Sequence, residues 1–120
     1  MIQTKRLEKV VIEALEALKA LDIIVIDVKR LTQVTDTMII CTGTSNRHVK
    51  SIADNVVETV KKKKVTPLGV EGEQDAEWIL IDLSNIIIHV MQQKTRDFYG
   101  LEKLWNLPKR GGKKEGKKAK

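Results

Sequence analysis

Hydrophobic residues recur at helical spacing in two long segments of the chain. The first segment, residues 5–20, would be capped by Thr4, and the second begins at Asn46. Their apolar stripes are Leu7, Val10, Val11, Ala14, Leu18 and Leu21 in the first and Val49, Ile52, Ala53, Val56, Val57 and Val60 in the second. Four lysines, residues 61–64, follow the second stripe, where cations favour a helix C-terminus. Both segments are expected to be helices that cover a core.

Five shorter segments have the apolar, β-branched composition of strands. They are residues 23–28, 37–42, 65–72, 78–83 and 85–91. The first is apolar on both faces, which predicts a central strand, whereas Pro67 favours an edge position for the third. Little more than Ser84 separates the last two, so they are expected to form a tight antiparallel hairpin.

A last helical segment, residues 96–105, would be capped by Thr95 and closed by Pro108. The order of these elements predicts an α/β or α+β fold, in which a mixed sheet of about five strands packs with helices. The chain of 120 residues is expected to form one domain, residues 1–107, followed by a disordered basic tail, residues 108–120.

The net charge of +6 is concentrated in that tail. Residues 109–120 hold seven basic residues and one Glu, whereas residues 1–108 carry fifteen charges of each sign. The tail fits either a solubilising terminus or an arm that contacts RNA phosphates nonspecifically. The body lacks the basic patch and the aromatic cluster typical of an RNA-binding domain.

Cysteine usage and hydropathy indicate a cytoplasmic protein. Cys41 is the single cysteine, so no internal disulfide can form, which fits a reducing compartment. The N-terminal residues lack the apolar core of a signal peptide, and no apolar run approaches the roughly 18 residues of a membrane helix.

The stretch CTGTSNRHVK, residues 41–50, joins a strand to a helix as phosphate-binding turns do. Gly43 would permit an unusual turn, and Thr44 or Ser45 could cap the helix. The spacing matches neither a Walker loop nor a dinucleotide fingerprint. A two-metal nucleotidyltransferase also needs paired carboxylates, but Asp82-Leu83-Ser84 supplies only one. A nucleotide-binding or nucleotidyltransferase-type enzyme that uses this turn is therefore the alternative, and not the leading interpretation.

No other constellation predicts an active site, a metal or a cofactor. His48 and His89 lack sequence neighbours at metal-ligand spacing. Cys41 with a distant histidine is too little for a nucleophilic pair. A third reading is an RNA chaperone that works through its lysine-rich tail, and it predicts binding that falls steeply with salt.

The predicted hairpin is unusual because only one of its faces is purely aliphatic. The mixed face is formed by alternate residues of the two strands. They are Trp78, Leu80 and Asp82 in one strand and Ile87, His89 and Met91 in the other. Aromatic residues and Met are enriched in interface cores, so this face fits a partner-binding surface. It equally fits a face covered by a helix of the same domain, such as residues 99–105.

Several motifs together resemble the ribosomal silencing factor (Iojap-like) family. They are GTSNRHV, GVEG, EW-x-L-x-D and R-x-F-Y-x-LE-x-LW, and the resemblance covers about residues 4–107. The family's shared positions appear here as Gly43, Ser45, Arg47, His48, Gly69, Glu71, Gly72, Trp78, Asp82, His89, Arg96, Tyr99, Leu101 and Trp105. The basic tail lies outside the resemblance.

The resemblance implies a nucleotidyltransferase-like fold without the catalytic acids. It implies a non-enzymatic protein that binds the large ribosomal subunit through its protein L-fourteen and sterically blocks subunit joining, so that translation falls when nutrients run short. Some members of the family form homodimers.

The hairpin and the start of the last helical segment form the expected contact with the ribosomal protein. The residues proposed for it are Trp78, Leu80, Asp82, His89, Met91, Arg96 and Tyr99. Trp78 and Leu80 would be apolar anchors, while Asp82 and Arg96 would answer charges on the partner. Many relatives have an aromatic residue where this chain has Met91.

Overall fold

A computed structural model describes residues 3–100 as an α+β fold. The elements are α1 (Thr4–Ala17), β1 (Leu21–Asp27), β2 (Thr37–Gly43), α2 (Asn46–Lys62), β3 (Gly69–Glu71), β4 (Trp78–Asp82), β5 (Ile86–Gln92) and α3 (Gln93–Tyr99). The predicted mixed sheet with packed helices is confirmed. The extent predicted for the last helix, residues 96–105, is wrong, because α3 begins at Gln93 and ends at Tyr99, where Gly100 has a φ of 54°. Leu101, Trp105 and the basic tail lie outside the described residues.

The five strands form one sheet in the order β1-β2-β5-β4-β3. β2 and β5 pair in parallel, and the other neighbours pair antiparallel. The hairpin of β4 and β5 is confirmed, as is the edge position of the strand after Pro67. The central position predicted for residues 23–28 is wrong, because β1 lies at the other edge. Its apolar side chains are only partly covered there, and Val25 is 40% exposed.

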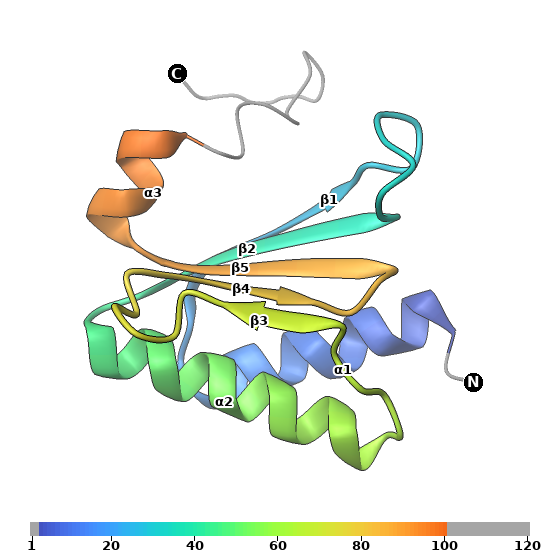
Figure 1. Cartoon of the computed structure of the whole chain (residues 1–120), viewed down its shortest axis with the longest axis horizontal. Helices are drawn as coiled ribbons and strands as arrows, with labels where there is room; N and C mark the ends of the chain where they lie inside the picture. The colour runs from blue at the N-terminus through green and yellow to red at the C-terminus, as the bar shows by residue number, and fades with distance from the viewer. Residues whose placement is uncertain (1–2, 101–120) are drawn as a thin grey trace.

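Two helices cover one face of the sheet, and the third lies on the opposite face. α1 and α2 run side by side beneath the sheet, while α3 projects above one end of it (Figure 1). The core between the sheet and the helix pair contains fully buried aliphatic side chains from every layer, among them Val11, Ile39, Ile52, Ile81 and Ile88. Burial of this one continuous core provides most of the folding free energy.

Both long helices end in the same hydrogen-bonded turn. After α1, Lys19 has a φ of 62°, and the amide of Ala20 donates to the carbonyl of Leu15. After α2, Lys64 has a φ of 69°, and the amide of Val65 donates to the carbonyl of Val60. This Schellman pattern pairs carbonyls that a helix end leaves free. It ends α1 three residues before the predicted boundary, so Leu21 belongs to β1 and not to the helical stripe.

Two of the predicted helix caps are wrong. Thr4 lies inside α1, where its hydroxyl accepts a hydrogen bond from the side-chain amide of Asn85. Thr95 lies within α3, which starts at Gln93 because the helix continues directly from β5. The predicted cap of α2 is confirmed, since the Ser45 hydroxyl accepts from the amide of His48 at 3.1 Å.

Candidate partner-binding surface

The two faces of the hairpin differ as their alternation predicts. Toward the helix pair, Ile79, Ile81, Ile88 and Val90 are completely buried. On the opposite face, Trp78, Leu80 and Asp82 are half-buried. The same face carries His89 and Met91 on β5, and both are buried. The mixed face is thus partly covered from within the chain and partly accessible.

Trp78 and His89 are joined by a hydrogen bond across the hairpin. The indole Nε1–H of Trp78 donates to Nδ1 of His89 at 2.9 Å. Because Nδ1 accepts, the neutral ring carries its proton on Nε2. Burial lowers the pKa of His89 from 6.5 to about 4, since the charged ring would lose its hydration. His89 is therefore neutral at physiological pH and available as an acceptor.

Trp78 also belongs to a cluster of three aromatic rings, with Tyr99 and Phe98. The ring centroid of Trp78 lies 5.0 Å from that of Tyr99, and Tyr99 lies 4.9 Å from Phe98 in an edge-on arrangement. Tyr99 is 57% exposed and Phe98 is 80% exposed. Phe98 was absent from the residues expected at this surface. Its position beside Tyr99 on a helix that leaves the sheet is the signal that could have found it.

The turn between β3 and β4, which leads into Trp78, is anchored by side-chain hydrogen bonds. The side-chain amide of Asn46 donates to the carbonyl of Asp75 at 2.8 Å, and Gln92 hydrogen-bonds the side chain of Asn46. Gly72 has a φ of 90°, and a Cβ there would lie 2.0 Å from the carbonyl oxygen of Trp78. Only glycine fits this close approach, which explains the last glycine of the GVEG motif physically.

Arg96 and Met91 have internal roles. The guanidinium of Arg96 is buried, and its Nη1 donates to the carbonyl of Asp22 at 2.9 Å and to the hydroxyl of Thr42 at 2.8 Å. Met91 is fully buried in a small second cluster with Val28, Met38 and Ile40, against which Trp78 and Ile26 pack. Of the seven residues expected to contact a partner, the structure brings Trp78, Leu80, Asp82 and Tyr99 to the surface and places His89, Met91 and Arg96 beneath it.

The turn after β2 is occupied by structural contacts. Nδ1 of His48 accepts from the amide of Thr44 at 2.8 Å, and its Nε2 lies 2.7 Å from the carbonyl of Leu18. Gly43 does not adopt the unusual backbone predicted for it. It is required because a Cβ would lie 2.7 Å from Cγ2 of Val49, where β2 meets α2. This turn therefore joins β2, α2 and the end of α1.

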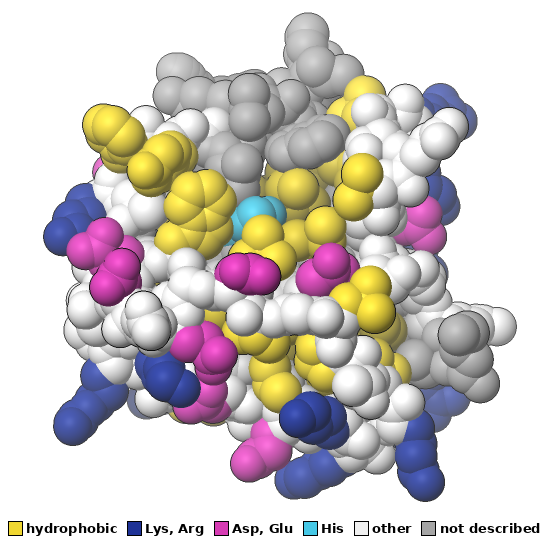
Figure 2. All heavy atoms as spheres, in the orientation of Figure 1, with side chains coloured by type: hydrophobic (Ala, Val, Ile, Leu, Met, Phe, Trp, Pro, Cys, Tyr) yellow, Lys and Arg dark blue, Asp and Glu magenta, His cyan; other side chains and the backbone are white. Residues whose placement is uncertain are grey.

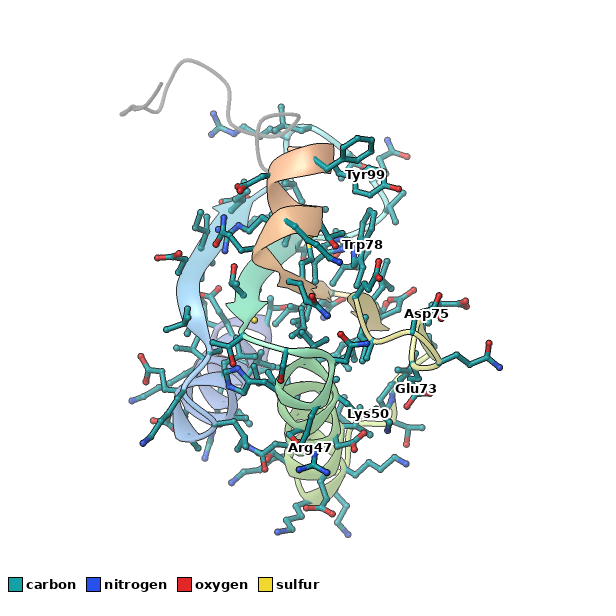
Figure 3. All side chains as sticks on the ribbon, turned by 90° about the vertical axis from the view of Figure 1, so that its left-hand side faces the viewer. Arg47, Lys50, Glu73, Asp75, Trp78 and Tyr99 are labelled. Carbon is teal, nitrogen blue, oxygen red and sulfur yellow. The ribbon has the colours of Figure 1, made fainter. Side chains whose placement is uncertain are left out.

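Charge is arranged unevenly around the aromatic cluster. Figure 3 shows Tyr99 and Trp78 at the upper end of one side, Asp75 and Glu73 below them, and Lys50 and Arg47 on α2 at the lower end. In Figure 2, acidic side chains lie beside the apolar ones below the visible histidine, and most of the lysines and arginines in this view lie on the lower, helix side. Glu71 faces the same side as Leu80, its partner across β3 and β4. We use the name hairpin surface for Trp78, Leu80, Asp82, Phe98 and Tyr99 together with the acidic residues that border them, Glu71, Glu73 and Asp75.

The described residues show none of the usual signs of a reactive centre. Within residues 3–100 no three His, Cys, Asp or Glu side chains come together as metal ligands. Cys41 is buried, and burial raises its pKa to about 12 although the charge of Arg96 opposes the rise. Among the same residues, no helix is both long and apolar enough to cross a membrane.

An α+β domain with an accessible aromatic cluster, an acidic border and an inert thiol has the properties of a protein that acts by binding a macromolecule. The profile of the family described as "Ribosomal silencing factor during starvation" (RsfS) matches residues 2–120. This chain belongs to that family, whose members are non-enzymatic, ribosome-binding regulators of translation.

Individual relatives agree with the family profile. The chain is 47% identical over 93 residues to the ribosomal silencing factor RsfS of Haemophilus influenzae. The aligned residues make up 78% of this chain and 91% of that protein. A crystal structure from Chromobacterium violaceum superimposes with a TM-score of 0.87 at 39% identity, over 93% of this chain and 90% of the other. A protein of Arabidopsis thaliana named "Protein Iojap-related, mitochondrial" is 32% identical over 63% of this chain and 44% of its own length.

Proposed function

We propose that this protein binds the large ribosomal subunit at its protein L-fourteen, sterically blocks joining of the small subunit and so represses translation in starvation or stationary phase. The aromatic cluster is the observation that carries the proposal. Trp78, Tyr99 and Phe98 lie together on the sheet face opposite α1 and α2, and two of them are more than half exposed. Exposed aromatic clusters on a folded domain are favoured as binding anchors.

The seven residues expected at the contact divide into two groups under this proposal. Trp78, Leu80, Asp82 and Tyr99 would touch the ribosomal protein, and Phe98 would join them as a further aromatic contact. His89, Met91 and Arg96 would support them from beneath, because their side chains are buried within this chain. Arg96 would then act on its own strands and not on a charge of the partner.

The border of the surface indicates the chemistry of the partner. Asp82 lies on the hairpin surface, Glu71 lies opposite Leu80, and Glu73 and Asp75 follow in the adjoining turn. The partner would therefore present an apolar patch flanked by lysine or arginine side chains, which favours fast and specific association.

Subunit joining provides the direct test. Trp78→Ala is expected to weaken comigration with isolated large subunits in a sucrose gradient and to restore subunit joining. Val34→Ala is a matched control, because Val34 is 74% exposed on the loop between β1 and β2, away from α3 (Figure 1). Binding that survives Trp78→Ala in a folded protein would contradict the proposed surface, and unfolding of the variant would make Trp78 a core residue instead. Loss of binding on deletion of residues 109–120 alone would assign the affinity to the tail.

The enzyme alternative has less support. The hydroxyl of Ser45 and the ring of His48 are already engaged in the local hydrogen bonds that start α2. We infer that the strand–turn–helix unit reflects a nucleotidyltransferase-like ancestry without its catalytic acids. Calorimetric titration with ATP or CTP and Mg²⁺ is expected to show no saturable heat up to millimolar nucleotide, and binding that Ser45→Ala abolishes would restore the alternative.

We further infer a cytoplasmic protein that uses no cofactor, whose tail adds nonspecific contacts to ribosomal RNA and which self-associates as a homodimer when free. Sedimentation equilibrium tests the dimer, and a single monomer mass across the accessible concentration range would contradict it. The tail contribution predicts that binding by the full chain weakens more steeply with salt than binding by residues 1–108.

A further inference from the structure

The polar end of Trp78 is satisfied inside the chain, although the indole belongs to the accessible hairpin surface. Its Nε1–H donates to Nδ1 of His89 at 2.9 Å, and the two ring centroids lie 5.8 Å apart. His89 itself is only 4% exposed. Tryptophan has one hydrogen-bond donor and no acceptor, so this single bond satisfies the whole polar requirement of the side chain.

The Trp78 side chain has contacts on two further sides. It packs against the buried cluster that contains Met91, and its ring lies 5.0 Å from that of Tyr99 between centroids, with an interplanar angle of 50°. Tyr99 is the last residue of α3, so the position of the indole and the end of that helix are connected. A shift of the Trp78 ring would therefore disturb Tyr99 and Phe98 as well.

We propose that His89 is the positioning residue of the hairpin surface: as a hydrogen-bond acceptor, it fixes the Trp78 indole against Tyr99 and leaves the partner an apolar ring face with no N–H to satisfy. This inference rests on the proposed function and deepens it. An indole N–H buried in an interface without an acceptor costs much of its desolvation free energy. Internal pairing with His89 removes that cost before the partner arrives, and it fixes one orientation of a large side chain in advance.

The inference also specifies the partner surface opposite Trp78. Because the donor is already paired, that surface needs no hydrogen-bond acceptor at this point and is expected to be aliphatic or aromatic. A surface residue whose polar atom points inward contributes area and shape, while the acids of the border contribute charge selectivity.

Substitutions at His89 test the positioning role. His89→Leu retains bulk but removes the acceptor, whereas His89→Asn retains an oxygen near the position of Nδ1. His89→Leu is expected to lower affinity for isolated large subunits by about tenfold, which is the scale of one lost hydrogen bond, and His89→Asn to stay within about threefold of the unsubstituted protein. In a Trp78→Phe background, which has no indole donor, His89→Leu is expected to change affinity by less than about twofold.

A spectroscopic measurement on the free protein reports positioning directly. The chain has two tryptophans, so Trp105→Phe leaves Trp78 as the single indole. The indole ¹H–¹⁵N resonance is expected to shift and broaden in His89→Leu and to keep its dispersed position in His89→Asn. If His89 contributed only to folding, the substitutions would shift the unfolding midpoint, and His89→Asn would not keep the indole resonance at its dispersed position.

Three results would overturn the inference. They are an unchanged indole resonance in His89→Leu, equal affinity of that variant, and equal losses from His89→Leu with and without the Trp78 indole. If His89→Leu does not fold, His89→Asn decides: a lost indole resonance, or an affinity more than about threefold below that of the unsubstituted protein, would overturn the inference. If the unsubstituted protein itself fails to bind large subunits, the proposed function falls and this inference falls with it. If it binds and His89→Leu binds equally well, only this inference falls.

Discussion

The buried ionisable side chains of the sheet, Cys41 and His89, are both held in their neutral forms by loss of hydration. For Cys41 the raised pKa leaves almost no thiolate at neutral pH, so a role as nucleophile is not supported. For His89 the lowered pKa keeps Nδ1 free to accept from Trp78. The same physical cause thus makes one side chain inert and the other useful.

Stability is expected to depend on pH through His89. The unfolded ring titrates near 6.5 and the folded ring near 4, so the unfolded state binds the proton first as the pH falls. The contribution of the neutral ring is complete above about pH 6.5 and is lost as the pH falls toward 4, by on the order of 3 kcal/mol. Denaturant unfolding from pH 7.5 to 4.5 measures it. His89→Asn, which keeps His48 but cannot titrate at position 89, is expected to show a clearly flatter profile.

Glycine substitutions are expected to separate close packing from open space. Gly72→Ala would place a Cβ 2.0 Å from the Trp78 carbonyl oxygen at a φ of 90°, and Gly43→Ala would place one 2.7 Å from Val49. We expect losses of more than about 3 kcal/mol and of about 1–3 kcal/mol respectively. Gly69→Ala is the control, because nothing lies within 4 Å of its Cβ position. Thermal unfolding that ranks Gly69→Ala with the other two would contradict this explanation.

At the scale of elements, Arg96 connects α3 with β1 and β2, which no local sequence pattern links. From α3 its Nη1 reaches the carbonyl of Asp22 in the irregular start of β1 and the hydroxyl of Thr42 in β2. Asp22 has a φ of 48°, and the register between β1 and β2 shifts there. An edge strand with such an irregularity depends on contacts from outside the ladder.

Arg96→Met is therefore expected to loosen β1 selectively. It leaves the buried hydroxyl of Thr42 and the part-buried carbonyl of Asp22 without this donor, at a cost of about 2–4 kcal/mol. Hydrogen exchange is expected to accelerate in β1 more than in β4. Lys94→Met on the exposed side of the same helix removes the same charge and should change neither quantity measurably. Uniform acceleration across all strands would indicate global destabilisation and no specific tie to β1.

At the scale of the whole molecule, charge is unevenly distributed on the face that Figure 2 shows. Acidic side chains lie beside the apolar ones, and most of the basic ones in this view lie toward the helix layer. Polarisation of this kind orients a protein as it approaches a charged partner and raises the association rate. The net charge alone, which belongs entirely to the tail, would have suggested only nonspecific attraction to RNA.

Charge reversal on the two sides is expected to have unequal effects. Glu71→Lys on the border should slow association with isolated large subunits by about five- to tenfold at low salt, with the difference shrinking as salt rises. Glu58→Lys on the outer side of α2 makes the same change in net charge and should have little effect. Stopped-flow association at two ionic strengths measures both variants, and equal slowing would show that only net charge matters.

The sequence by itself determined the amphipathic helices, the β4–β5 hairpin and the family. These depend on local periodicity, on short connections such as Ser84 and on motifs that local backbone geometry requires, Gly72 above all. The tertiary structure decided which apolar strand lies at the edge and that the side chains of Arg96 and Met91 are buried. It also decided that Trp78 contacts His89 and Tyr99. Alternation assigns a residue to one face of a strand, but burial depends on which distant element covers that face, and strand order depends on pairings between segments far apart in the chain.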